Sequence, residues 1–221
     1  MTKIKLCGLS RMEDIETANQ LRPDYAGFVF APGSPRQVTP SQAVRLKSAL
    51  DPSIKAVGVF VDEDPENVAQ LLAAGIIDLA QLHGRESPGY LRMLMAFSGR
   101  SIIQAFRIKG AEDLARAKES AADHLLLDAG AGDGIAFDWT LLRGFPQPYL
   151  LAGGLTPENV ADAVRTLRPW GVDVSSGIET KGRKDPKKME AFVTAVRNVD
   201  RKESNSPKAV GSDHTKSPGE I

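Results

Sequence analysis

The side chains best suited to acid–base chemistry each end a short apolar run of the sequence. Cys7 is the only cysteine, His83 ends the run Leu79–His83, and Asp128 ends the run His124–Asp128. A thiol can act as a base, and a carboxyl group in apolar surroundings can stay protonated and act as an acid. Each has a plainer interpretation, because a lone cysteine is often a small buried apolar residue and an aspartate after a strand often caps a turn.

Two glycine-containing loops are suited to binding a phosphate group. Their residues are Gly153 and Gly154 in one loop and Ser175, Ser176 and Gly177 in the other. Glycine allows the backbone to approach a ligand closely, and a helix that begins immediately after the first loop would point its free amides and positive dipole end at an anion. A pair of glycines can also simply form a tight turn.

Three further polar residues are weaker candidates. Arg36, in a loop rich in proline and glycine, could bind a carboxylate through its planar guanidinium group, or be an ordinary exposed arginine. His83 could donate a hydrogen bond to a substrate or to a nearby loop carbonyl. Asp62 also follows an apolar run, so position alone does not choose between Asp62 and Asp128.

These residues need a scaffold that brings them together, and the sequence predicts one of alternating strands and helices. The predicted strands are Lys3–Cys7, Tyr25–Phe30, Lys55–Val61, Leu79–His83, Ile102–Arg107, His124–Asp128, Tyr149–Leu151 and Val172–Ser175. The predicted helices are Met12–Leu21, Ser41–Leu50, Pro65–Ala74, Pro88–Phe97, Ala111–Ser120, Phe137–Arg143, Pro157–Leu167 and Pro186–Val199. Eight strand–helix units predict a closed α/β barrel of the (β/α)8 TIM type, with an open doubly wound sheet as the alternative.

Four helix starts have a capping side chain followed by proline, which is typical of a first helical turn. The capping residues are Asp64, Ser87, Thr156 and Asp185. Their regular spacing supports the predicted units. In such a barrel the reactive groups lie at the carboxyl ends of the strands, where all the candidates above are found.

Alternation along the strands predicts an ion pair beneath the thiol. If Cys7 points into the barrel, Lys5 shares its face, and the same parity on the last strand places Asp173 beside Lys5 once the barrel closes. A buried lysine needs a partner, so we expect a Lys5–Asp173 pair. Residual positive potential there would favour the thiolate form of Cys7, although the pair could also be purely structural.

Composition narrows the function classes. The 221 residues carry 28 basic and 28 acidic side chains, so no global field attracts nucleic acid or an anionic membrane. One cysteine and three scattered histidines give no zinc signature. The charged start is no export signal, and the longest apolar stretch, Leu71–Ile77, is too short to span a bilayer. We therefore expect a cytoplasmic protein without a metal, which binds neither nucleic acid nor membrane.

Two remaining segments need interpretation. Residues 201–221 have no aromatic residue and no periodic pattern, so we expect residues 1–200 to form the barrel and residues 201–221 to form a flexible tail. Gly130, Gly132 and Gly134 after Asp128 resemble a dinucleotide fingerprint, but Ile135 stands where its third glycine would fall. Binding of NAD is therefore not expected.

The motifs as a set resemble phosphoribosylanthranilate isomerase of tryptophan biosynthesis. They are Lys5–Leu9, Ala26–Phe30 with Ser34–Arg36, Val57–Val61, Gln81–Gly84, Phe137–Trp139, Leu151–Leu155, and Val172–Glu179 with Lys184–Asp185. The resemblance covers about residues 3–199 and has motifs in seven of the eight units. It implies a (β/α)8 barrel that performs an Amadori rearrangement of N-(5'-phosphoribosyl)anthranilate without a cofactor.

The resemblance also implies roles for individual residues. The general base falls on Cys7, the general acid on Asp128, and the arginine that binds the anthranilate carboxylate on Arg36. The two loops at Gly153 and Ser175 correspond to the family's phosphate site. His83 and Asp173 match positions that line the site and contact the substrate.

Two features depart from the family pattern. Asp133 stands where a small polar residue is common, in a short segment after the sixth strand, and the C-terminal extension is not part of the family core. Two alternatives remain: a related histidine-pathway isomerase, which is expected to have an aspartate at the position of Cys7, and a phosphate sensor that has lost the acid or the base. We expect a monomer, with a homodimer as the alternative, because no large exposed apolar face is evident.

Overall fold

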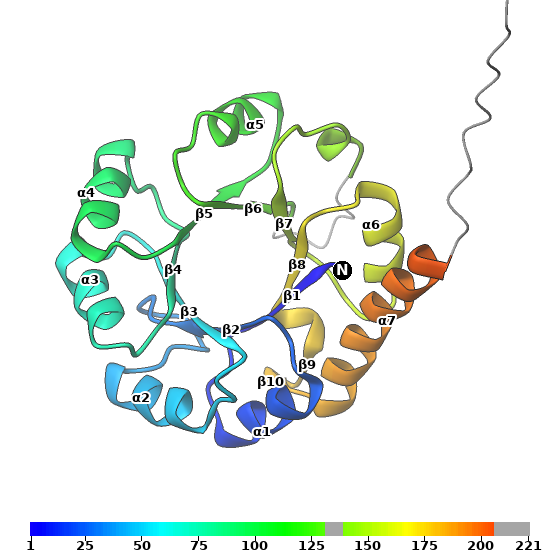
Figure 1. Ribbon diagram of the computed structural model, residues 1–221, viewed down its shortest axis with the longest axis horizontal. Coiled ribbons are helices and arrows are strands. Elements are labelled where there is room, and N and C mark those ends of the chain that lie inside the picture. Colours follow the sequence, from blue (N-terminus) through cyan, green and yellow to red (C-terminus); the bar gives the residue numbers. More distant parts are fainter. Residues whose placement is uncertain (131–138, 206–221) are drawn as a thin grey trace, which may run out of the picture.

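The computed structural model describes residues 1–130 and 139–205. Eight parallel strands close into a barrel in the order β1 to β8, with the helices around the outside (Figure 1). The strands are β1 Lys3–Cys7, β2 Tyr25–Val29, β3 Lys55–Phe60, β4 Leu79–Leu82, β5 Ile102–Arg107, β6 His124–Asp128, β7 Tyr149–Ala152 and β8 Gly171–Val174. All lie within one residue of their predicted ends. The predicted closed barrel is confirmed.

The helices agree with prediction in the first five units and differ after β6. The α-helices are α1 Met12–Leu21, α2 Pro40–Ala49, α3 Pro65–Ala73, α4 Pro88–Ser98, α5 Ala111–Lys118, α6 Val160–Leu167 and α7 Pro186–Asn205. The predicted helix Phe137–Arg143 is wrong over the described residues, where a 3-10 turn, η1 (Trp139–Leu142), takes its place. The end predicted at Val199 is also wrong, since α7 continues to Asn205.

Local capping explains where several helices begin. The side chains of Asp64 and Ser87 accept hydrogen bonds from backbone amides of α3 and α4, as predicted. Asp185 does the same at the start of α7. The Thr156 hydroxyl likewise accepts from a backbone amide, that of Glu158, but α6 begins only at Val160 and not at the predicted Pro157.

A sharp turn after β8 produces an element that the sequence pattern did not predict. A 3-10 turn, η2 (Ser176–Ile178), leads into a small antiparallel hairpin of β9 (Glu179–Thr180) and β10 (Arg183–Lys184). Lys181 and Gly182 join its strands with positive φ angles of 52° and 73°. The hairpin lies below the ends of β8 and β1 in Figure 1.

The apolar core has two parts, as strand alternation requires. The larger part packs the outward faces of the strands against the helices. The smaller part fills the barrel interior with Val57, Leu79, Ile103, Ala105, Leu126, Leu150 and Ala152. Polar groups share this interior: Lys5, Gln81 and Asp173 are all buried.

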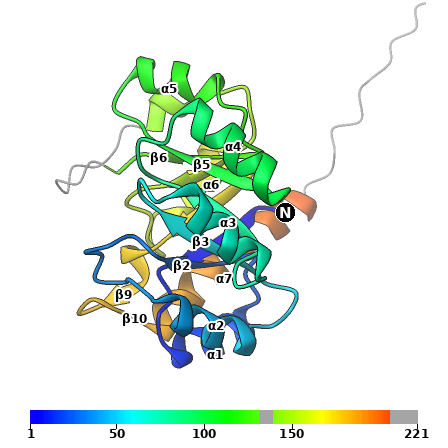
Figure 2. The same ribbon diagram turned by 90° about the vertical axis from the view of Figure 1, so that its left-hand side faces the viewer.

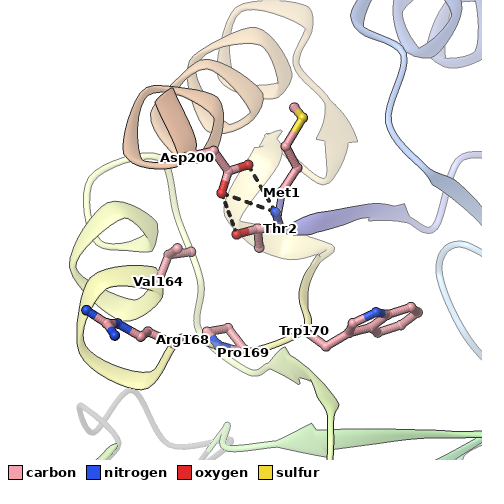
Figure 3. Close-up of a pocket in the computed structure, with 7 residues that line it drawn as sticks. All are labelled: Met1, Thr2, Val164, Arg168, Pro169, Trp170 and Asp200. Atoms are coloured by element: carbon pink, nitrogen blue, oxygen red, sulfur yellow. Dashed lines mark hydrogen bonds between the residues drawn. The ribbon is translucent and has the colours of Figure 1, made fainter. Parts of the chain in front are cut away.

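The two ends of the described chain meet on the face opposite the β9–β10 hairpin (Figure 2). The carboxylate of Asp200 in α7 accepts hydrogen bonds from the amide and the hydroxyl of Thr2, at 2.8–3.1 Å (Figure 3). This contact attaches the last helix to the first strand. Over the residues described, no helix combines the length and apolar character that crossing a membrane requires.

Candidate active site

A cavity of about 1390 Å³ opens at the carboxyl ends of the strands. It contains every site residue predicted from the sequence. Those residues are Cys7, Arg36, His83, Asp128, Gly153, Gly154, Asp173, Ser175, Ser176 and Gly177. Asp62 is not among the lining residues; its carboxylate accepts a hydrogen bond from the Arg85 amide in the neighbouring loop.

The predicted ion pair beneath the thiol is present. Lys5 Nζ lies 2.8 Å from Asp173 Oδ1, and the two residues are paired in the register of β1 and β8. The Lys5 side chain is fully buried. Burial lowers its pKa, but Asp173 and Cys7 outweigh this and raise the pKa to about 12. Lys5 is therefore a fixed positive charge in the barrel.

Cys7 is buried and lies above Lys5, on the same face of β1. Gly27 is its partner on β2, and a Cβ atom there would lie 2.7 Å from Sγ, so the missing side chain makes room for the sulfur. Burial raises the pKa of the thiol by more than Lys5 lowers it. Lys5 lowers the pKa of the thiol, as expected, but desolvation outweighs this effect, so the predicted preference for the thiolate is wrong.

Asp128 ends β6 and faces His83, which follows β4. Oδ2 of Asp128 lies 3.3 Å from Nε2 of His83, a close contact that is not aligned as a hydrogen bond. Burial raises the pKa of Asp128, but His83 and the Gly130 amide outweigh it, so the pKa lies below its ordinary value. The expectation that burial keeps Asp128 protonated is therefore wrong, because its neighbours outweigh burial.

Gln81 supports His83 from inside the barrel. It lies on β4 with its side chain buried, and Nε2 is 3.2 Å from Nδ1 of His83. With the amide in this orientation, Nδ1 accepts and the ring proton is on Nε2, toward Asp128. Gln81 is a site residue that sequence reasoning missed, although its parity with His83 on β4 was a usable signal.

Arg36 is held by the β9–β10 hairpin. Its Nε and Nη2 donate to the two carboxylate oxygens of Glu179, at 2.6 and 2.8 Å. The buried Lys184 ammonium donates to Glu179 Oε1 at 2.6 Å. Burial raises the pKa of Glu179, but Arg36 and Lys184 reverse this and lower it to about 2. Glu179 and Lys184 lay within the quoted motifs, but only the hairpin fold brings them to Arg36.

The loops after β6, β7 and β8 pack backbone against backbone. A Cβ atom on Gly153 would collide with the Gly130 amide, and one on Gly177 would collide with the Leu155 carbonyl. Gly153 and Gly154 have positive φ angles of 94° and 65°. Because α6 begins only at Val160, its dipole does not start directly after this pair, contrary to expectation.

Two basic residues that sequence reasoning missed also line the cavity. Arg107 ends β5 beside Asp128 in the strand register, and Lys109 follows in the next loop. Both add positive charge to the wall of the cavity. Asp133, Phe137 and Asp138 lie outside the described residues. Within the parts of the chain that are described, no three His, Cys, Asp or Glu side chains gather as a metal site.

Comparisons with known proteins agree on one family. A family model described as N-(5'phosphoribosyl)anthranilate (PRA) isomerase matches residues 4–195. N-(5'-phosphoribosyl)anthranilate isomerase of Thermoanaerobacter sp. (strain X514) is 45% identical over 206 residues, which cover 90% of this chain and 100% of that protein.

Solved structures give the same result. Phosphoribosyl anthranilate isomerase from Thermotoga maritima superimposes with a TM-score of 0.83 at 33% identity, covering 90% of this chain and 100% of that one. A second isomerase structure, in complex with reduced 1-(o-carboxyphenylamino)-1-deoxyribulose 5-phosphate, has a TM-score of 0.81 at 34% identity and the same coverage. The chain therefore belongs to the N-(5'-phosphoribosyl)anthranilate isomerase family, and it is an isomerase of tryptophan biosynthesis.

Proposed function

We propose that Cys7 and Asp128 carry the proton transfers of this isomerase. The reaction is the Amadori rearrangement of N-(5'-phosphoribosyl)anthranilate to 1-(2-carboxyphenylamino)-1-deoxyribulose 5-phosphate. Asp128 protonates the ring oxygen of the ribose, and the ring opens to an iminium. Cys7 then removes the proton from C2, which gives an enolamine that tautomerises to the ketone. Both steps are proton transfers, so the proposal needs no cofactor.

The two groups must exchange a proton before they can act. Burial raises the pKa of Cys7, which favours the thiol, and the neighbours of Asp128 lower its pKa, which favours the carboxylate. The mechanism needs the thiolate and the carboxylic acid, which have the same total number of protons. The reactive form is therefore a minor arrangement of the same protonation state, and bound substrate selects it.

The remaining predicted residues hold the substrate. We assign the phosphate to the amides and hydroxyls of the loops at Gly153–Gly154 and Ser175–Gly177, and the anthranilate carboxylate to Arg36. His83 contacts the substrate beside Asp128, and Asp173 contacts it beside Cys7. Holding the substrate at both ends fixes the ring oxygen and C2 against the acid and the base.

One observation supports this proposal more than any other. Cys7 and Asp128 belong to strands on different sides of the barrel, yet they line one cavity together with Arg36 and both phosphate loops. A cavity with an acid, a base and two anion-binding ends matches a substrate that carries a phosphate at one end and a carboxylate at the other.

The test follows the loss of anthranilate fluorescence from freshly made substrate. Cys7→Ala and Asp128→Asn should each lower kcat at least about 100-fold, the range expected for loss of a proton-transfer group. Asp62→Asn is the matched control, because it makes the same change in the loop after β3 and outside the cavity. Full activity of either site variant would remove that residue from its role.

We also propose that the chain acts as a cytoplasmic monomer whose catalytic domain extends to the end of α7 at Asn205, past the predicted boundary at residue 200, and that residues 206–221 are not needed for activity. Over the described residues, the large exposed apolar side chains lie on several separate elements, among them Met12 in α1, Val44 in α2 and Phe97 in α4. One structural relative from Thermotoga maritima is described as dimeric. Sedimentation equilibrium at micromolar concentration tests the monomer, and a dimer mass would contradict it.

A further inference from the structure

Arg36 is already bound to a carboxylate before any substrate arrives. Glu179 accepts from Nε and Nη2 of Arg36 in the two-point geometry that arginine forms with carboxylates. The guanidinium group has five N–H donors, so Nη1 and the second N–H of Nη2 remain. Arg36 also lines the cavity. It therefore retains enough donors to bind a second carboxylate while Glu179 holds it.

A bare Arg36–Glu179 pair would nevertheless be a poor anion site. The pair has no net charge, and the negative Glu179 would repel an incoming carboxylate at short range. With its pKa lowered to about 2, Glu179 is ionised throughout the range in which enzymes work. Something must offset this charge if Arg36 is to attract the substrate.

Lys184 is placed to do so. Its side chain is 2% exposed, and its ammonium donates to Glu179 Oε1 at 2.6 Å and to the Ser175 carbonyl at 2.9 Å. A third contact, at 3.3 Å, reaches the Ser175 hydroxyl, so all three ammonium hydrogens have acceptors. Lys184 and Glu179 are paired in the register of the β9–β10 hairpin.

We propose that Lys184 is a positioning residue for the isomerase: by neutralising Glu179, which holds Arg36, it leaves one net positive charge facing the substrate's carboxylate. This inference rests on the role proposed above for Arg36. It adds that specificity for the carboxylate belongs to the three-residue group Arg36–Glu179–Lys184 and not to the arginine alone. It also connects that group to Ser175, in the loop assigned to the phosphate.

The test measures how strongly the enzyme prefers a ligand with the carboxyl group. Calorimetric dissociation constants are compared for reduced 1-(o-carboxyphenylamino)-1-deoxyribulose 5-phosphate and for the same molecule without its carboxyl group. The carboxyl preference is the ratio of the two constants. Because both ligands carry the phosphate, any effect of Lys184 on the Ser175 loop cancels in this ratio.

The variants separate charge from structure. Lys184→Met should reduce the carboxyl preference at least about tenfold, because it leaves Glu179 uncompensated. The double variant Glu179→Gln with Lys184→Met removes both charges and restores one net positive charge, so its preference should return to within about threefold of the native value. A purely structural role for Lys184 does not produce this recovery.

Two outcomes would overturn the inference alone. One is an equal loss of affinity for both ligands in Lys184→Met, and the other is a double variant no better than the single one. Arg36→Met tests the role on which the inference rests, and it should abolish the preference. If Arg36→Met kept the native preference, the proposed role of Arg36 would fail and the inference with it.

Discussion

Asp128 and His83 face each other across the mouth of the barrel, with a carboxylate oxygen 3.3 Å from the imidazole Nε2. Asp128 ends β6 and His83 follows β4, with only β5 between these strands, so the two side chains meet at the carboxyl end of the barrel wall. The contact also opposes burial, which on its own would raise the pKa of Asp128. His83 is therefore one of the neighbours that lower the pKa of the proposed acid.

Removing the imidazole should raise the pKa of Asp128. In His83→Leu, burial acts with less opposition, so the carboxyl group should titrate at a higher pH than in the native protein. The measurement is a 13C titration of the aspartate carboxyl groups, with the Asp128 signal assigned by its absence in Asp128→Asn. His124→Leu is the control, since it makes the same change at the other end of β6 and should leave Asp128 unaffected. If Asp128 titrated at the same pH in His83→Leu as in the native protein, His83 would have no effect on its pKa.

The opposite pKa shifts of Cys7 and Asp128 predict the shape of the pH profile. The reactive form has the same number of protons as the dominant form, so kcat/KM should stay level between the pKa of Asp128 and that of Cys7. The alkaline decline should begin above pH 9.0, the ordinary thiol value, because burial raises the pKa of Cys7. Alkylation of Cys7 by iodoacetamide should show the same pKa.

Substitution of Lys5 tests whether the alkaline decline belongs to Cys7. Lys5 lowers the pKa of the thiol, so Lys5→Met should move both the alkaline decline of kcat/KM and the alkylation titration to higher pH. A decline near neutral pH in the native enzyme would contradict the assignment to Cys7. An alkylation titration that Lys5→Met leaves unchanged would remove Lys5 from the mechanism.

The barrel and much of the site were predictable because successive side chains along a strand alternate between its two faces. Alternation placed Lys5 and Asp173 on the interior face, and closure of β8 on β1 then required their ion pair, which is present. The rule that barrel sites lie at the carboxyl ends of strands placed Cys7 and Asp128 in one cavity. These relationships depend only on the strand period and on closure.

The errors arose where local contacts compete. The Thr156 hydroxyl accepts from a backbone amide as predicted, but the Asn159 side chain bonds to both sides of the turn that follows, and α6 begins at Val160. The protonation states of Cys7 and Asp128 depend on the balance between burial and individual neighbours, which residue spacing does not reveal. Residue spacing also does not reveal the contact between Glu179 and Arg36, because the hairpin after β8 is needed to bring them together.

Gly8 should prove essential for the position of Arg36. Gly8 has a φ of 77°, and a Cβ atom there would lie 2.5 Å from Arg36 Cδ, because the arginine crosses the end of β1 at this point. Gly8→Ala should therefore raise KM at least about tenfold by displacing the guanidinium group. Gly33→Ala is a matched control, since Gly33 has a φ of 78° in the loop that carries Arg36 but has open space around it. Both substitutions strain the backbone, and equal KM values for the two would show that displacement of Arg36 is not the cause.

Asp200 should contribute to stability without affecting catalysis. Its buried carboxylate accepts from the amide and the hydroxyl of Thr2 and attaches α7 to the start of β1, on the face opposite the β9–β10 hairpin. Asp200→Ala should lower the free energy of unfolding by about 2–3 kcal/mol, the range for lost hydrogen bonds to a buried charged group. That loss corresponds to a fall in Tm of roughly 4–12 °C for a chain of this size.

Because Asp200 lies far from the cavity, its substitution should lower stability and leave catalysis unchanged. At a temperature where the variant remains folded, kcat/KM should equal the native value, because the cavity lies at the other end of the strands. Asp162→Ala is the control: its ion pair with Arg165 is exposed on α6, and such pairs contribute at most about 1 kcal/mol. A chain that ends at Asn205 should match the native Tm, since Asp200 and its contacts with Thr2 are retained. If Asp200→Ala lowered kcat/KM while the fold stayed intact, the two faces of the barrel would be coupled, and the separation of stability from catalysis would be wrong.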